Sequence, residues 1–218
     1  MRSSRASNRA AWLLVLTLVS VGGAELSAHR RDEYLQAARL SIEPDSVHVE
    51  LDLTPGIALA ESIIADIDRN QDGLLSADEQ AAYGSLVLSA IEVDVDGRRL
   101  DMRLGNARYP DFNAMRRGEG TIQLQLATGL EGQSPGTHQL LFRNTHRPDG
   151  GVYLANALVP ESDRVAIARQ QRDGNQSELV IDYVVRLPAP GTHPWLLSGL
   201  VVSAALSALL LRSSRFAR

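Results

Sequence analysis

The chain of 218 residues contains no cysteine, which excludes disulfides, thiolate metal sites and cysteine nucleophiles. Its formal net charge of −4 supplies no basic field, and this argues against a nucleic-acid partner. A phosphate-binding glycine loop and a zinc-type H-x-x-x-H pair are also missing. We therefore predict that the protein is not an enzyme, and the sequence identifies no small-molecule substrate.

The N-terminal end of the chain, in contrast, carries a long apolar run. Three arginines within the first nine residues precede an uncharged run that continues to Ala24. This is the layout of a secretory signal peptide, which we place at residues 1–28 with cleavage after Ala28; cleavage after Ala24 is the alternative. An uncleaved membrane anchor would also carry such a run, although this one is shorter than the ~20 residues that a span prefers.

The C-terminal end has a second apolar run. Residues 195–211 carry no charge, and three arginines follow within residues 212–218. A run of about 17 residues is at the short end of what crosses a bilayer, and arginines favour the cytoplasmic side. We therefore predict a linker at 191–194, a transmembrane helix at 195–211 and a basic cytoplasmic tail at 212–218. A buried core helix and a removable sorting tag, which LPAPGTHPW (187–195) loosely matches, are the alternatives.

Between these ends, residues 29–190 have the pattern of an exported β domain. Residues 46–53 alternate apolar and polar side chains, a period of two that indicates a half-buried strand. Asp96 and Gly97 separate two further alternating runs, which is a strong hairpin signal. Roughly seven to nine short strands predict a mainly β (α+β) fold, an antiparallel Ig-like β-sandwich. The polar stretch 105–120 is predicted to be a long loop.

Residues 54–90 interrupt this β pattern with two helical segments. Thr54 has the position of an N-cap and Pro55 that of a first helical residue. Ser76 and Glu79 have the spacing of a capping box at the start of the second helix. The apolar stripe of that helix is predicted at Tyr83, Leu86, Val87 and Ala90. The two helices therefore form an insertion in the sandwich.

The stretch that joins these helices, DRNQDGLLSADE (68–79), places oxygen-bearing side chains at alternate residues. Its candidate metal ligands are Asp68, Asn70, Asp72, the Leu74 carbonyl, Ser76 and Glu79. A hard divalent cation needs several oxygens at one point, and alternate residues of a tight loop supply them. Gly73 permits the positive φ at which the chain reverses. The alternative is a polar turn that binds nothing, but three carboxylates drawn together without a cation would repel one another.

This loop, with its flanking helices, resembles an EF-hand, and the resemblance covers only residues 54–90. It implies that the loop binds Ca²⁺ through the six ligand positions named above. EF-hands normally occur in pairs, whereas this chain contains a single copy. A lone loop facing the exterior implies a weak structural site, with a dissociation constant of about 10⁻⁴–10⁻³ M. Mg²⁺ would require stricter octahedral geometry.

A second resemblance concerns AHRRDEYLQA (28–37) and the strands that follow. They are similar to the exported N-terminal region of bacterial membrane proteins that carry a nickel-permease-like segment of the hydrogenase and urease accessory type. This chain lacks that multi-span segment, so transport is not implied. Accessory work in Ni or Cu handling is the alternative function, because cleavage after Ala28 would leave His29 with a free amine that chelates such ions.

The sequence thus predicts a membrane-anchored, extracytoplasmic calcium-binding module. Its folded domain is expected in the periplasm or the extracellular space, with a single pass through the cell membrane. The ion is predicted to be structural. The module is predicted to act as a binding or scaffold domain for a protein partner that the sequence does not identify.

Overall fold

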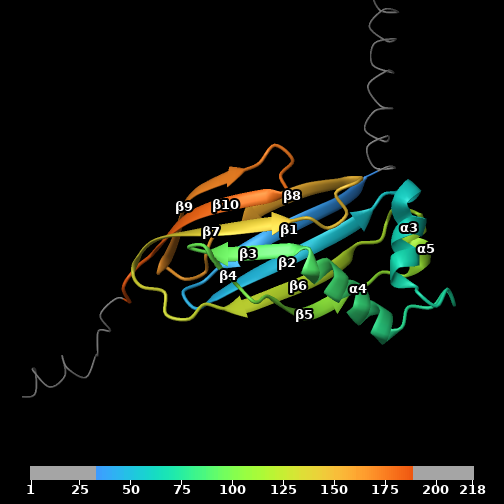
Figure 1. Cartoon of the computed structure of the whole chain (residues 1–218), viewed down its shortest axis with the longest axis horizontal. Helices are drawn as coiled ribbons and strands as arrows, with labels where there is room; N and C mark the ends of the chain where they lie inside the picture. Colours follow the sequence, from blue (N-terminus) through green and yellow to red (C-terminus); the bar gives the residue numbers. More distant parts are fainter. Residues whose placement is uncertain (1–32, 189–218) are drawn as a thin grey trace, which may run out of the picture. The chain divides into compact units, whose positions relative to one another are not determined.

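The computed structural model describes residues 33–188, which form two five-stranded sheets, A and B (Figure 1). Sheet A has the order β5-β6-β2-β1-β8, and sheet B has the order β4-β3-β7-β10-β9. The strands of sheet A are β1 (Tyr34–Ile42), β2 (Ser46–Pro55), β5 (Arg103–Arg108), β6 (Ile122–Gly129) and β8 (Gly151–Ala157). Those of sheet B are β3 (Ile91–Val95), β4 (Arg98–Arg99), β7 (Gly136–Asn144), β9 (Val165–Arg172) and β10 (Glu178–Val185). A mainly β fold with few helices, as predicted, is confirmed.

The inner faces of both sheets share one hydrophobic core, because the strands alternate as their sequences predict. In β2 every second side chain from Val47 to Leu53 is fully buried. Phe142 of β7 and Ile181 of β10 enter the same core from sheet B. Each large aliphatic or aromatic side chain buried in this way stabilises the fold by about 1.5–3 kcal/mol.

Three tight connections follow the turn chemistry of the sequence. Residues 43–45 join β1 to β2, and residues 173–177 join β9 to β10. Asp96 and Gly97, at φ values of 52° and 78°, join β3 to β4. Positive φ at both central residues matches the right-handed twist of a two-residue hairpin, which is why Asp-Gly predicts it. The predicted hairpin at Asp96–Gly97 is therefore confirmed.

One strand pair contradicts the prediction of a purely antiparallel sandwich. β1 and β8 are parallel, with Tyr34 opposite Gly151 and Leu40 opposite Ala157. β7 ends at the same end of the molecule where β1 begins, and residues 145–150 cross there to sheet A. β8 therefore starts beside Tyr34, whose N–H donates to the Gly150 carbonyl at 2.8 Å.

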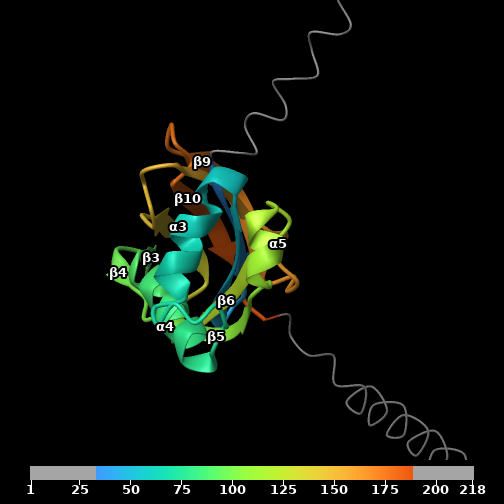
Figure 2. The same ribbon diagram turned by 90° about the vertical axis from the view of Figure 1, so that its right-hand side faces the viewer.

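The three helices gather at one end of the sandwich, which we call the helical end; the opposite end is the far end (Figures 1 and 2). They are α3 (Ile57–Ile67), α4 (Ala77–Ser89) and α5 (Phe112–Arg116). Tyr34, at the start of β1, lies at the helical end. Val185, at the close of β10 and opposite Gly136, lies at the far end. The compact unit that contains both sheets ends at Arg186.

The predicted start of the first helix is wrong. Thr54 and Pro55 belong to β2, where they lie opposite Leu35 and Tyr34 of β1. Helix α3 begins at Ile57, and its N-cap, Gly56, provides no side-chain hydrogen bond. Pairing with β1 extends the strand through the residues whose local preference is to begin a helix.

The second helix agrees better with its prediction. Ser76 and Glu79 form the reciprocal hydrogen bonds of a capping box, as expected. Tyr83 and Val87 are buried, but Leu86, predicted on the apolar stripe, is 44% exposed. Gly84, which lowers helix propensity, lies against β5: a Cβ there would lie 2.6 Å from Cδ2 of Leu104, so that side chain would have to shift.

The prediction of a long loop over residues 105–120 is also wrong in part. β5 continues to Arg108, and α5 follows at Phe112–Arg116. The side chain of Asp111 caps α5 by accepting a hydrogen bond from the Ala114 amide at 2.9 Å. Phe112 and Met115 face the core, so this short helix closes the helical end beside α3.

Candidate functional site

The candidate ligand loop lies between α3 and α4, as the sequence predicts. Asp68 is the C-cap of α3, and its N–H donates to the Ile64 carbonyl at 2.7 Å. Ser76 is the N-cap of α4. The carboxylates at the first and last residues of the loop are buried: Asp68 is 6% exposed and Glu79 is 8% exposed. The loop lies at the surface of the molecule, yet these two acidic side chains are buried, which indicates that the loop is folded around them.

Asp68 organises the first half of the loop through both of its carboxylate oxygens. Oδ1 accepts the Asp72 amide at 3.2 Å, and Oδ2 accepts the Gly73 amide at 2.9 Å. Gly73 has a φ of 76°, the left-handed conformation predicted for the chain reversal. Asp72 in turn accepts the Leu74 amide at 2.8 Å. Backbone donors thus offset the repulsion expected between these carboxylates.

Glu79 closes the second half of the loop. Its Oε1 accepts the Arg69 amide at 3.1 Å, and its Oε2 accepts the Ser76 amide at 3.1 Å and the Ser76 hydroxyl at 2.7 Å. These hydrogen bonds, those from Ser76 first, lower the pKa of Glu79. The glutamate therefore stays ionised at neutral pH and joins the entry of the loop to the start of α4.

The remaining candidate ligands lie at the surface. Asn70, Asp72 and Ser76 are exposed, as is Leu74, of which only the carbonyl was predicted to bind. Among residues 33–188, no three His, Cys, Asp or Glu side chains are gathered closely enough to hold a metal ion by themselves. The loop contains two buried carboxylates, at its first and last residues, and exposed neutral and acidic oxygens between them. Such an all-oxygen donor set fits Ca²⁺ and does not fit softer metals.

Helix α3 is attached to the segment that follows β7. Arg147 forms an ion pair with Asp66, its Nε donating to Oδ2 at 3.0 Å. The same guanidinium donates to the Ser62 hydroxyl and to the Ser62 carbonyl, both at 3.2 Å. One arginine thus holds the last two turns of the helix that leads into the loop.

Helix α4 is attached to the core through Tyr83. Its hydroxyl lies 2.8 Å from the Tyr34 hydroxyl and 3.3 Å from Nε2 of His146. Burial raises the pKa of Tyr83 to about 12 and lowers the pKa of His146 to about 4. All three side chains are therefore neutral at physiological pH, as a buried network without a counter-charge requires.

A buried amide pair completes this network. Asn144 donates to Gln36 Oε1 at 2.9 Å and accepts the His146 amide at 2.9 Å. The His146 carbonyl accepts two hydrogen bonds, from the Gln36 amide at 2.7 Å and from the Tyr153 hydroxyl at 3.0 Å. We did not predict this cluster from the sequence. Its one local signal is Gln36, a polar residue on the inward face of an otherwise apolar strand.

A second group of titratable side chains lies at the far end. Residues 132–136 read GQSPG, the letter spacing of a nucleophile elbow, so our prediction that the sequence lacks this motif is wrong. His138 Nδ1 lies 2.7 Å from Asp96 Oδ2, but its Nε2 lies 2.8 Å from the Ser134 carbonyl rather than the hydroxyl. Both partners are acceptors, so both ring nitrogens donate and the imidazole is charged. This arrangement is that of a structural ion pair and not of a serine hydrolase.

Three predicted features remain outside the described residues: the signal peptide with His29, the linker and span at 191–211, and the tail. None of the helices within residues 33–188 is long and apolar enough to cross a bilayer. Comparison with protein-family models, curated proteins and solved structures found no match to this chain.

Proposed function

We propose that residues 57–89 form a single EF-hand-like site that binds one Ca²⁺ and that the ion is structural. The observation that carries this proposal is the burial of Asp68 and Glu79, the first and last candidate ligands, at the junction of two anchored helices. The ion would be held by Asp68, Asn70, Asp72, the Leu74 carbonyl, Ser76 and Glu79. Their oxygens would neutralise its charge while it relieves the repulsion among three carboxylates.

Calcium would act on stability because the loop joins two helices with separate attachments. α3 is held by Arg147 and α4 by the Tyr83 network, so a bound ion adds a third connection between them. At about 5 mM Ca²⁺ and a dissociation constant of about 10⁻⁴–10⁻³ M, the gain is about 1–2 kcal/mol. The structural setting we propose is an exported, Ig-like module tethered by the span at 195–211, with a binding or scaffold role.

Thermal unfolding of the exported protein, cleaved after Ala28 so that it begins at His29, tests this function, first in EDTA and then with about 5 mM Ca²⁺, a concentration above the expected dissociation constant. We expect Ca²⁺ to raise the melting temperature by several degrees, and Glu79→Gln to abolish the rise. Asp78→Asn is the matched control, because Asp78 is the exposed neighbour of Glu79 on the same helical turn.

No response to Ca²⁺ in the unmodified chain would contradict the proposal. Stabilisation by micromolar Ni²⁺ or Cu²⁺ alone would instead support the alternative site at His29. Equal responses in Glu79→Gln and the unmodified chain would place the ion elsewhere in the molecule.

A further inference from the structure

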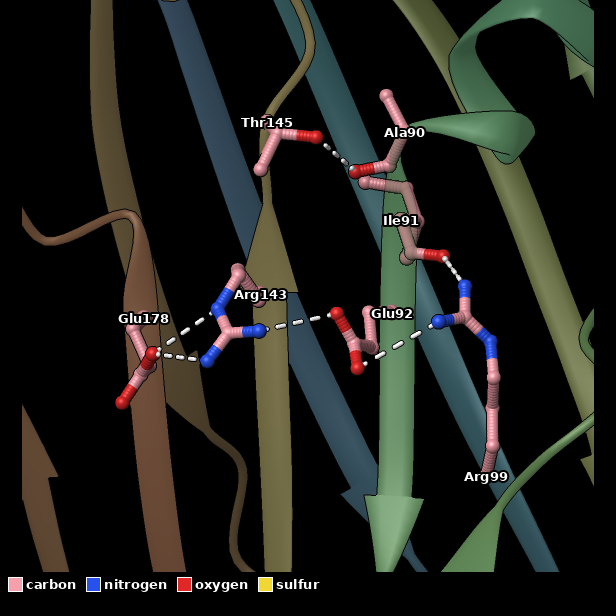
Figure 3. A network of polar contacts seen from close by, with 7 residues as sticks. All are labelled: Ala90, Ile91, Glu92, Arg99, Arg143, Thr145 and Glu178. Atoms are coloured by element: carbon pink, nitrogen blue, oxygen red, sulfur yellow. Dashed lines mark hydrogen bonds and ion pairs between the residues drawn. The ribbon is translucent and has the colours of Figure 1, made fainter.

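The two solvent-facing sides of this sandwich differ in how their polar side chains are used. On sheet B, Arg143 donates to Glu178 at 2.8 and 3.0 Å and to Glu92 at 3.0 Å (Figure 3). Arg99 extends this row from β4 to Glu92. A second row joins Gln139, Asp182 and Arg169 at 2.9 Å each. In these two rows on the outer face of sheet B, the charged and amide side chains are therefore paired with one another across the strands.

The outer face of sheet A instead contains a polar groove. Two adjoining hollows of about 250 and 480 Å³ share Glu50, Asn106 and Gln125 as lining residues. The groove crosses β1, β2, β6 and β5, which is about 14 Å at a strand spacing of about 4.8 Å. A hollow of this length accommodates a chain-like ligand better than a single small molecule.

An irregularity in β5 shapes this groove. The register between β5 and β6 shifts between Leu104 and Asn106, so Gly105 is the extra residue of a bulge. A Cβ at Gly105 would lie 3.5 Å from the Gln125 carbonyl, an ordinary contact, and the backbone there is not left-handed. Neither packing nor φ requires glycine at this position. Because Gly105 has no side chain, it leaves the second hollow open.

The polar groups of the groove divide into a paired set and an unpaired set. Arg39 is held between Glu50 at 3.0 Å and Asp52 at 2.8 Å. The side chains of four further lining residues make no hydrogen bond or ion pair with any residue in the described part of the chain. They are His48, Asn106, Arg108 and Gln125. This groove thus offers donors and acceptors that its neighbours do not use.

The composition of the groove limits the class of ligand. It is lined by four carboxylates, from Glu43, Glu50, Asp52 and Glu161, against two guanidinium groups, from Arg39 and Arg108. An excess of acidic groups repels nucleic acid, phosphorylated ligands and acidic polymers. Aromatic side chains are absent from the lining, so planar apolar ligands find no stacking surface.

We propose that the outer face of sheet A binds a neutral, hydroxyl-rich chain, an oligosaccharide, across β1, β2, β6 and β5. Each amide offers both donors and an acceptor and each carboxylate offers acceptors, which together match hydroxyl groups that donate and accept, and a neutral ligand meets no charge repulsion. Asn106 and Gln125 are the central contacts, because both hollows meet at their side chains. This inference is independent of the calcium site, which lies at the helical end.

Isothermal titration calorimetry tests the proposal. The full-length protein, kept in a zwitterionic detergent so that no sugar headgroup competes, is titrated with maltohexaose, cellohexaose and the hexamer of N-acetylglucosamine. We expect at least one of these to bind. Gly105→Trp, which fills the second hollow, and Gln125→Ala should each weaken binding at least tenfold. Gln171→Ala, an exposed amide on the outer face of sheet B, is the matched control and should bind as the unmodified chain does.

Three outcomes would overturn the proposal: no binding of any hexasaccharide, equal binding by the unmodified chain and both groove variants, or equal weakening by Gln171→Ala. An arginine-rich peptide that binds in place of every sugar would also overturn it, since the groove would then select cations. Thermal unfolding verifies that each variant is folded. If Gly105→Trp is not, Gln125→Ala alone decides the test.

Discussion

Strand β7 has a histidine near each end, His138 at the far end and His146 just beyond the helical end, and the pKa values of the two imidazoles are shifted in opposite directions. His146 is 4% exposed among the hydroxyls of Tyr34 and Tyr83, and burial lowers its pKa to about 4. The hydrogen bond from His138 to Asp96 raises the pKa of His138 above its ordinary value. The pKa of the same type of side chain is therefore lowered at one end of the strand and raised at the other.

This difference indicates how strongly each end should respond to mutation and to a change of pH. In the buried network at the helical end the polar groups are enclosed, so they depend on protein partners, and losing a partner can leave an unsatisfied group. At the far end Asp96 is half-exposed, so water replaces any partner that is lost. Mutations and pH changes should therefore act strongly at the helical end and weakly at the far end.

Removal of the Asn144 side chain should have the largest effect. Asn144→Ala leaves Gln36 Oε1 and the His146 amide buried without partners. At roughly 1–3 kcal/mol for each unsatisfied group, we expect a loss of about 4 kcal/mol in the free energy of unfolding. Urea denaturation measures it. Gln139→Ala, an exposed amide on the same strand, is the control and should cost less than about 1 kcal/mol; equal losses would remove the contrast between the ends.

Acid should be the next largest perturbation, through His146. Its folded pKa of about 4 lies below the ordinary value of 6.5, so between these values only the unfolded chain takes up the proton. Stability is therefore full above about pH 6.5 and falls by about 3 kcal/mol as pH drops toward 4. Urea denaturation across this range measures the slope, and His146→Gln should flatten it. A slope unchanged in His146→Gln would assign the effect to other groups.

Loss of the ion pair between Arg147 and Asp66 should have the third largest effect on stability. Arg147→Ala removes that pair and both contacts to Ser62, and we expect a loss of about 1–2 kcal/mol because the pair is partly buried. Arg169→Ala breaks the more exposed pair with Asp182 on sheet B and should cost less than about 1 kcal/mol. Thermal unfolding of both variants compares them directly. A larger loss for Arg169→Ala would contradict the ranking.

Titration of His138 should have the smallest effect on stability. Its pH dependence should be opposite in sign to that of His146. Its raised pKa means that the charged imidazole stabilises the fold fully below about pH 6.5, and this contribution disappears as pH rises through the folded pKa. Since Asp96 is half-exposed, we expect no more than about 1 kcal/mol between pH 6 and 9. Comparison of Asp96→Asn with the unmodified chain over that range measures it; a gain of stability with rising pH would reverse our assignment.

The features that we predicted correctly depend on residues close together in the chain. Ser76 and Glu79 form their capping box within one turn, and Asp96-Gly97 determines its hairpin by backbone conformation alone. The order of the ligand loop between two helices has the same local origin. Whether the loop binds Ca²⁺ stays a prediction.

What we missed depends on distant partners. Thr54 extends β2 because β1 lies beside it, and β8 is parallel because the chain crosses at the helical end. Gln36 and Asn144 meet although they are 108 residues apart. Helix α5 has only five residues, too few to show a helical period. Local pattern carries no information on any of these contacts.

The path of the chain through the sheets has a mechanical consequence. β1 and β10 lie in the interior of different sheets and run in the same direction, from the helical end to the far end. Tension applied between Tyr34 and Val185 would therefore act along the strands. It would load the interstrand hydrogen bonds of β1 and β10 simultaneously, in shear, instead of opening them one after another. By its topology, this module resists stretching along its strand axis.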